Sequence, residues 1–324
     1  MGITVSVIIP VYKYLDKIAR CLDSLVAQKY KNFEVILVCH SSTYEEVYRI
    51  AQRYNLNSKV IKVEKDGISI CRNVGIANSK GRYIAFVDSD DYVLDRYLEV
   101  LLGEMGKDVP LAMCNYMQKI ENETDIHFYK LANKEYTIEE LINNMYGEVP
   151  QYNGFLWNKL FDAQIIKEKN IKFDEEVSLN EDRLFIITYL LALEKNSKIK
   201  YNADTQYCYI QHPKSITTRL ERGELEKEKA MSEIVSFVKC EKMLEDYENV
   251  IDKLVRECVE RSIRILRLLK KHSSESKRIG KNLKRLRKQY SYLFTRKRRL
   301  QMFVYEHYLL RTALIILGGR TYYN

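Results

Sequence analysis

Three aspartates within four positions follow a short apolar segment of the sequence. Residues 83–87 read YIAFV, and Asp88, Asp90 and Asp91 come next. Alternate residues of an extended chain point the same way, so we expect the carboxylates of Asp88 and Asp90 to converge. Carboxylates this close repel each other unless a cation or a hydrogen-bonding ligand lies between them. A small set of oxygen ligands suits Mg²⁺ or Mn²⁺ bound together with a diphosphate.

One of these aspartates also has a structural explanation. Asp91 precedes a segment with helical periodicity, and carboxylates are favoured at the N-terminal end of a helix. A helix cap accounts for a single aspartate and leaves the other two unexplained. We therefore expect metal–diphosphate binding at Asp88 and Asp90, with a helix N-cap as the alternative reading of Asp91.

A second polar pair, Arg72 and Asn73, lies upstream of the aspartates, on or beside a predicted helix at residues 68–79. A guanidinium can neutralise a nucleotide phosphate or hold an aspartate, and the sequence leaves both open. The structural alternative is an ordinary surface helix that stops at Gly81.

Strand-like and helix-like segments alternate along the first 120 residues and must position these side chains. Strands are predicted at 5–12, 33–38, 59–63, 83–87 and 111–117, and helices at 15–26, 44–54, 68–79 and 95–104. Nearly continuous apolar strands that alternate with helices are typical of a mostly parallel sheet flanked by helices, in the α/β class. Ligands bind at the carboxyl ends of the strands in such sheets, which is where the aspartates lie.

The rest of the chain divides into an irregular part and a helical part. Between residues 121 and 219 we expect a helix near 137–146, an amphipathic helix near 181–195 and a hairpin-like pair of Tyr-rich strands at about 199–211. From residue 222 onward the pattern is helical almost throughout. The sequence therefore predicts a catalytic α/β domain at 1–219 and a helical, basic C-terminal region at 220–324.

The net charge of +9 is concentrated in the C-terminal region. Residues 261–300 hold 16 Lys and Arg against 1 acidic residue, which indicates a surface that meets phosphates. Because aromatic and aliphatic residues follow, we expect this region, from about residue 261, to lie on an anionic membrane surface. Nucleic acid is not an expected partner, since no recognised binding motif accompanies the charge. A packed helical bundle with a solvated basic face is the alternative.

The cysteines and the N-terminus bear on the cellular compartment. The seven cysteines include no C-x-x-C pair, and the N-terminal residues have no basic region of the kind that begins a signal peptide. No apolar run reaches the roughly 18 residues needed to cross a bilayer. We expect reduced thiols and a cytoplasmic protein, with a peripheral position at the inner face of the cell membrane as an extension.

Several motifs in consistent order resemble the family 2 glycosyltransferases of the GT-A fold. They are Pro10 and Tyr12 after the first strand, the G-x-S-x-x-R-N-x-G of residues 67–75, YIAFVDSDD, W-N-K-L-F at 157–161 and N-E-D at 180–182. The resemblance covers roughly residues 4–218. It implies inverting transfer of a hexosyl or N-acetylhexosaminyl group from a nucleotide-sugar, usually a UDP-sugar, to a glycan or lipid-linked acceptor in cell-surface polysaccharide synthesis.

The resemblance also implies roles for individual residues. Asp182 would be the general base, with Glu181 as the neighbouring candidate. Asp90 would ligate Mn²⁺ or Mg²⁺, and His212 is a candidate for a further metal contact. The nucleotide-sugar would be held by Pro10, Tyr12, Cys39, Arg72, Asn73, Asp88 and Ser89, with Tyr12 stacked on the base and Asp88 at the ribose.

Two departures from the family pattern concern the nucleobase. Where the family usually has acidic residues after the second strand, this chain has Cys39 and His40, and Lys13 replaces a common Asn. The loss of these carboxylates also suggests a rival function, a catalytically silent nucleotide-sugar-binding module. A nucleotidyltransferase on a similar sheet is a third reading. The sequence predicts no oligomeric state.

Overall fold

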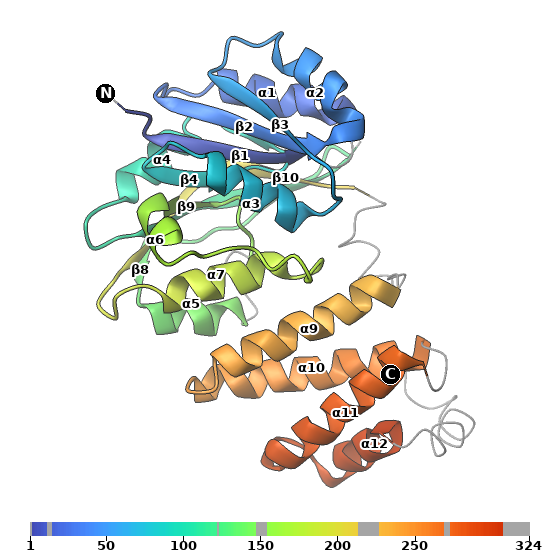
Figure 1. Ribbon diagram of the computed structural model, residues 1–324. Helices are drawn as coiled ribbons and strands as arrows, with labels where there is room; N and C mark the ends of the chain where they lie inside the picture. The colour runs from blue at the N-terminus through green and yellow to red at the C-terminus, as the bar shows by residue number, and fades with distance from the viewer. Residues whose placement is uncertain are drawn as a thin grey trace. The chain divides into compact units, whose positions relative to one another are not determined.

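The computed structural model describes residues 2–11, 15–121, 123–146, 154–212, 227–268 and 273–306. The chain divides into two compact units, Met1–Glu224 and Leu225–Asn324 (Figure 1). The expected boundary between residues 219 and 220 falls outside the described ranges, so it stays a prediction.

The first unit is built on one sheet, to which ten strands of the described residues contribute. The strand order is β3-β2-β1-β4-β9-β6-β10-β5, with β7 beside β6 and β8 beside β10. The strands are β1 (Val5–Val11), β2 (Phe33–His40), β3 (Ser58–Val63), β4 (Tyr83–Phe86), β5 (Tyr92–Val93), β6 (Leu111–Ile120), β7 (Ile126–Phe128), β8 (Lys134–Tyr136), β9 (Lys159–Asp162) and β10 (Ile199–Gln211).

The longer pairings in the sheet are parallel. Strand β1 pairs in parallel with β2 and β4, β2 with β3, and β6 with β10. Strand β9 is antiparallel to both β4 and β6, and β5 is antiparallel to β10. The predicted mostly parallel sheet is therefore confirmed, and the carboxyl ends of β1, β2 and β4 share one edge.

Helices cover both faces of this sheet, as the alternating sequence predicts (Figure 1). They are η1 (Leu15–Lys17), α1 (Ile18–Val26), η2 (Ser41–Thr43), α2 (Tyr44–Ala51), α3 (Ile68–Asn78), α4 (Tyr97–Glu104), α5 (Ile138–Met145), α6 (Ala163–Glu168) and α7 (Glu181–Leu191). One core cluster joins β1 and β2 to α1, α2 and α4. A smaller cluster joins the opposite face of β2 to α3.

Two segments differ from their predicted structure. The expected hairpin at 199–211 is the single strand β10, whose register against β6 shifts between Asn202 and Thr205 and again before Tyr207. The polar residues that resemble a turn thus form an irregularity within one strand. The W-N-K-L-F segment contributes β9, a strand that the sequence analysis does not predict.

The second unit is helical, as predicted. Its described elements are α9 (Lys227–Met243), α10 (Glu248–Leu268), α11 (Ser274–Gln289), η4 (Ser291–Leu293) and α12 (Arg296–Glu306). Buried apolar side chains such as Phe237, Leu254 and Leu283 form its interior. The guanidinium of Arg285 donates to both carboxylate oxygens of Glu241 and so ties α11 to α9. Within the described ranges, the helices are too short or too polar to span a membrane.

Candidate active site

Arg72 of α3 brings three of the predicted carboxylates together. Its Nη1 donates to Glu181 Oε1 at 2.8 Å and to Asp182 Oδ1 at 2.5 Å. Its Nη2 lies 3.6 Å from Asp88 Oδ1. The guanidinium is almost fully buried, with 2% of the side chain exposed. Of the two roles left open for Arg72, the structure shows the one in which it holds carboxylates.

Gly75 explains why α3 can place Arg72 at this edge. A Cβ at Gly75 would lie 2.4 Å from Ile8 Cγ2 of β1, closer than any real Cβ contact. Only glycine therefore allows α3 to pack this close to the central strand. Gly67, which precedes the helix, has a φ of 151°, in the range that favours glycine. Gly67 thus allows the backbone conformation that begins the helix, and Gly75 allows the helix to pack closely against β1.

Burial raises the pKa of two carboxyl groups beside Arg72, those of Asp88 and Asp182. Burial raises the pKa of Asp182 well above its ordinary value, although Arg72 opposes the shift. Burial also raises the pKa of Asp88, to about 6. A carboxylate with a raised pKa is better suited to take a proton near neutral pH. Asp182 has 21% of its side chain exposed against 11% for Glu181, so it is the more accessible of the two.

Asp90 lies against His212, the other residue predicted to contact a metal. Its Oδ2 is 3.2 Å from His212 Nε2, which joins the turn after β4 to the residue that follows β10. Two adjacent ligands of an octahedral Mg²⁺, each about 2.1 Å from the ion, lie roughly 3 Å apart. Mg²⁺ and Mn²⁺ take few protein ligands and complete their shells with water and phosphate oxygens. The Asp90–His212 pair therefore fits such a cation, although no group of three or more metal-ligating side chains occurs among the described residues.

Asp91 has a structural role, and the helix-cap reading of it is wrong. Its carboxylate accepts from the Tyr207 hydroxyl and from the Ile210 N–H, both at 2.7 Å. Helix α4 begins only at Tyr97, with Arg96 at its N-cap. The side chain is fully buried, and its two hydrogen bonds tie the turn after β4 to strand β10. The third aspartate therefore holds the loop that presents the other two.

Three residues near the aspartates are not predicted from the sequence, because no motif marks them: Glu121, Lys17 and Arg20. Glu121 follows β6 and accepts from His212 Nδ1 at 2.7 Å. Its other oxygen lies 2.7 Å from Lys17 Nζ of η1. Hydrogen bonds from Lys17 and His212 lower the pKa of Glu121 to about 2. Arg20 of α1 donates to the backbone carbonyl of Asp90.

The predicted nucleobase residues are less open than the sequence suggests. Pro10 and Cys39 are buried in β1 and β2, and Cys39 belongs to the main core cluster. The ring of His40 accepts from the Ser42 N–H and caps η2. Tyr12 and Lys13 lie outside the described residues. The base-binding roles of Pro10, Tyr12 and Cys39 stay predictions.

Asn73 and Ser89 differ in what the structure does with them. Asn73 clamps the backbone of Phe173, since its amide donates to the Phe173 carbonyl at 2.9 Å and accepts from the Phe173 N–H at 2.8 Å. This explains the asparagine of the motif as a brace between α3 and the segment before α7. Ser89 is buried between Asp88 and Asp90. Their contacts to a nucleotide-sugar stay predictions.

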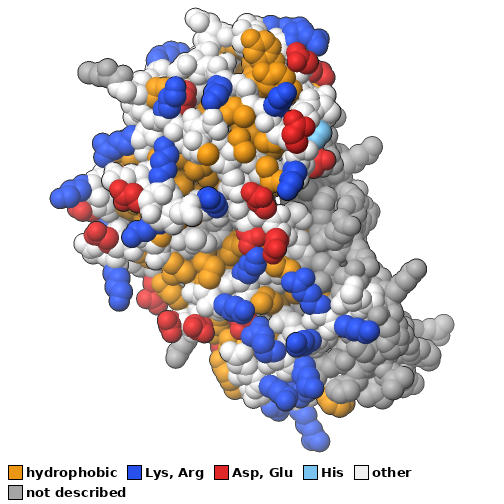
Figure 2. All heavy atoms as spheres, in the orientation of Figure 1, with side chains coloured by type: hydrophobic (Ala, Val, Ile, Leu, Met, Phe, Trp, Pro, Cys, Tyr) orange, Lys and Arg blue, Asp and Glu red, His pale blue; other side chains and the backbone are white. Residues whose placement is uncertain are grey.

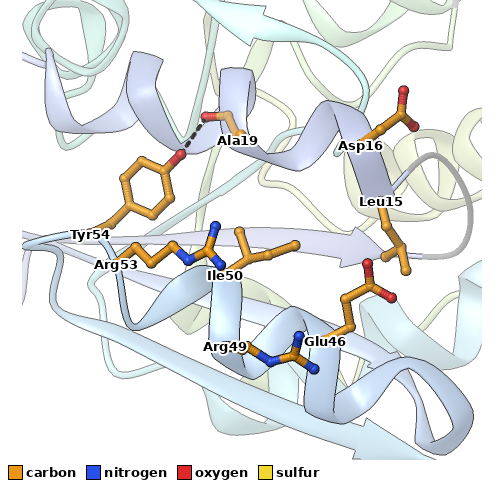
Figure 3. A pocket seen from close by; sticks show the side chains of 8 residues that line it. All are labelled: Leu15, Asp16, Ala19, Glu46, Arg49, Ile50, Arg53 and Tyr54. Atoms are coloured by element: carbon orange, nitrogen blue, oxygen red, sulfur yellow. Dashed lines mark hydrogen bonds between the residues drawn. The ribbon is translucent and has the colours of Figure 1, made fainter.

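A separate surface pocket lies between η1, α1 and α2 (Figure 3). Its lining mixes acidic and basic side chains, among them Asp16, Glu46, Arg49 and Arg53. Tyr54 closes one end, where its hydroxyl donates to the Ala19 carbonyl at 3.2 Å. The predicted site residues are not part of this lining, so the pocket is distinct from the carboxylate cluster.

Sequence comparisons place the chain among known enzymes. The profile described as Glycosyl transferase family 2 matches residues 6–166. EpsH of Bacillus subtilis (strain 168), a presumed glycosyltransferase, is 30% identical over 266 residues, which cover 78% of this chain and 74% of EpsH. The poly(ribitol-phosphate) beta-glucosyltransferase of Bacillus spizizenii (strain W23) is 31% identical over 219 residues, which cover 64% of this chain and 32% of that protein.

A structural comparison agrees with the fold. The crystal structure of S. aureus TarS 1–349 in complex with UDP-GlcNAc matches with a TM-score of 0.62 at 19% sequence identity. The match covers 99% of this chain and 93% of the TarS chain. At this level of identity the likeness shows a shared architecture.

Proposed function

Since the chain belongs to glycosyl transferase family 2 and has the GT-A fold, we propose that it is a metal-dependent, inverting transferase that uses a UDP-sugar. The observation that carries this proposal is the meeting of Asp88, Asp182 and Arg72 beside the Asp90–His212 pair. A proton acceptor and a candidate cation site thus lie near one edge of the sheet. Transfer of a sugar from a diphosphate donor needs both.

Asp182 is the general base in this proposal. It takes the proton from the acceptor hydroxyl as that oxygen attacks the anomeric carbon from the side opposite the diphosphate. Arg72 holds the Asp182 carboxylate by a charge-assisted hydrogen bond, which fixes its direction. Glu181 shares the same nitrogen of Arg72 and is more buried, so its role is to hold the guanidinium in place.

Asp90 and His212 would hold the divalent cation, Mn²⁺ or Mg²⁺. When bound, the cation supplies positive charge for the diphosphate that leaves. Asp88 contacts the ribose region of the donor from the end of β4. Arg20 supports this loop through the Asp90 carbonyl.

In this proposal the site discriminates only weakly between nucleobases. Cys39 is buried, and the ring of His40 is used to cap η2, so neither provides the anionic acceptor that a carboxylate would give to a base N–H. Such a charged hydrogen bond contributes roughly 1.5 to 3 kcal/mol. We expect UDP to be preferred only modestly, and calorimetry that shows GDP or CDP bound tenfold more tightly would contradict this.

The sugar is a hexose or an N-acetylhexosamine, and the acceptor is a glycan or a lipid-linked glycan of a cell-surface polysaccharide. The named relatives support both sugar classes, since one is a glucosyltransferase and the similar structure contains UDP-GlcNAc. A panel of UDP-sugars with each candidate acceptor separates them.

A second part of the proposal places the enzyme in the cytoplasm, at the inner face of the membrane. Lys and Arg side chains gather over the C-terminal helices in Figure 2. Tyr292 and Leu300 are exposed beside these charges, with 69% and 63% of their surface accessible. Of the aromatic residues that follow the basic stretch, Phe303 is exposed and Tyr305 is buried in the helical unit. Residues 307–324 lie outside the described residues.

The proposal is tested by identifying the products formed from donor and acceptor by the purified protein. We expect Mn²⁺- or Mg²⁺-dependent release of UDP and transfer of the sugar with inverted anomeric configuration. Release of pyrophosphate instead would indicate a nucleotidyltransferase. Donor binding without turnover on any acceptor of the panel would favour the silent binding module.

A further inference from the structure

A line of alternating charged and polar groups leads away from the Asp90–His212 pair. Lys17 Nζ lies 2.7 Å from Glu121 Oε1, and Glu121 Oε2 lies 2.7 Å from His212 Nδ1. His212 Nε2 in turn lies 3.2 Å from Asp90 Oδ2. The four residues come from η1, the end of β6, the end of β10 and the turn after β4. The line is therefore assembled by the fold and has no signature in the sequence.

Glu121 determines which nitrogen of His212 carries a hydrogen. A carboxylate only accepts hydrogen bonds, so the contact at 2.7 Å requires that His212 Nδ1 donates its hydrogen to Glu121. In the neutral ring the other nitrogen, Nε2, then carries the lone pair. That lone pair faces the carboxylate of Asp90.

Such a pair of electron-rich atoms needs a positive partner. A lone pair on Nε2 and a carboxylate oxygen 3.2 Å apart repel each other unless a proton or a cation lies between them. The ring has only 3% of its side chain exposed, so its surroundings fix its orientation. A histidine that donates its second N–H to a carboxylate is a common arrangement behind bound metals, because the carboxylate orients the ring and raises its basicity.

We propose that Glu121, braced by Lys17, is a positioning residue that orients His212 and sets the affinity of the Asp90–His212 pair for Mn²⁺ or Mg²⁺. Lys17 holds the second oxygen of Glu121, so the carboxylate does not turn away from the ring. This inference rests on the proposed function for the identity of the cation.

The first experiment measures binding of Mn²⁺ alone to the full chain. Electron paramagnetic resonance of free Mn²⁺ gives the dissociation constant for the wild type, Glu121→Gln and Lys17→Met. We expect Glu121→Gln to weaken binding about 10- to 100-fold, the usual effect of removing a carboxylate behind a metal-binding histidine. Lys17→Met should also weaken Mn²⁺ binding, by a smaller factor. Glu123→Gln, an exposed carboxylate two residues away, is the matched control and should change nothing.

The second experiment separates positioning from a general structural effect. In a His212→Ala background, Glu121→Gln should cause no further loss of Mn²⁺ affinity, because Glu121 acts only through the imidazole. UDP affinity measured with a chelator present should stay within about twofold in all variants. If Glu121→Gln does not fold, Lys17→Met in both backgrounds decides the same question.

The inference is overturned by unchanged Mn²⁺ affinity in Glu121→Gln, or in the variant that replaces it. It is also overturned by an equal loss of Mn²⁺ affinity with and without His212. The inference also fails if the wild type does not bind Mn²⁺, or if it transfers sugar with the chelator present. Either result would leave glycosyl transfer by the protein intact. A wild type that binds Mn²⁺ through this pair yet releases no UDP would contradict the proposed function and leave the role of Glu121 standing.

Discussion

At the residue scale, the central feature is one guanidinium among three carboxylates. Arg72 contacts Asp88, Glu181 and Asp182 while almost fully buried, so the negative charge around it exceeds the positive. Burial then raises the pKa of Asp88 to about 6. A site with this excess of negative charge favours ligands that bring positive charge, such as a divalent cation.

The raised pKa of Asp88 predicts how stability depends on pH without metal. The folded protein holds this proton more tightly than the unfolded chain, whose Asp titrates near pH 3.9. Stability from this group is therefore fully present below about pH 4 and is lost as the pH rises through about 6. Asp88→Asn should be more stable than the wild type by about 1 to 2 kcal/mol at pH 8, and equal to it near pH 4.

Urea unfolding with a chelator present, at pH 4 and pH 8, measures this difference. Asp66→Asn, at an exposed position, is the control and should be neutral at both values. A variant at Asp88 that is less stable than the wild type at pH 8 would show that the attraction of Arg72 outweighs the cost of burial.

At the element scale, the depth of α3 against β1 decides where Arg72 lies. The sequence predicts α3 and the strands on either side of it in the chain, β3 and β4, because their periodicities are local. It also marks the glycines, but only the structure shows that Gly75 faces Ile8. Asp91 and Glu121 were misread or missed for the opposite reason, since their partners are more than 90 residues away and leave no local pattern.

Gly75→Ala should destabilise the first unit by about 1 to 3 kcal/mol, because the new methyl group would overlap the buried side chain of Ile8. Gly103→Ala is the matched control, since a Cβ there meets nothing within 4 Å in helix α4. Alanine should stabilise that helix by up to about 1 kcal/mol. Free energies of unfolding in urea measure both, and equal values for the two variants would contradict the close packing.

At the scale of the whole molecule, the chain combines a transferase fold with a basic helical unit. The sequence predicts both because composition and charge change along the chain. The part of this unit expected to lie on a membrane starts at about residue 261, however, which lies inside α10, where Ser262 is fully buried. The C-terminal unit is therefore a packed set of helices that carries its charge on exposed faces, and a truncation before Ser262 would divide a helix.

One basic face of α11 gives the membrane proposal a test in the full chain. Four exposed lysines follow one another at spacings of four, three and four residues, which places them on one side of the helix: Lys277, Lys281, Lys284 and Lys288. Each charge close to an anionic bilayer contributes about 1 kcal/mol. Replacing all four by glutamine should weaken binding to phosphatidylserine vesicles at low salt by at least about tenfold.

The control replaces four exposed lysines of the first unit by glutamine: Lys65, Lys107, Lys172 and Lys195. Vesicle sedimentation should show little change for this variant. Equal binding of both variants and the wild type, or no binding by the wild type, would leave α11 as a solvated face of a structural bundle.

The most direct test of the account is sugar transfer by Asp182→Asn beside Glu181→Gln. Both changes preserve side-chain size and leave an oxygen for Arg72, so folding and UDP-sugar binding should be retained. Because the proposed mechanism has only the Asp182 carboxylate take the proton of the acceptor, turnover should fall by about 10² or more in Asp182→Asn and much less in Glu181→Gln. Unchanged turnover in Asp182→Asn, with or without a loss in Glu181→Gln, would contradict the proposed catalytic role of Asp182.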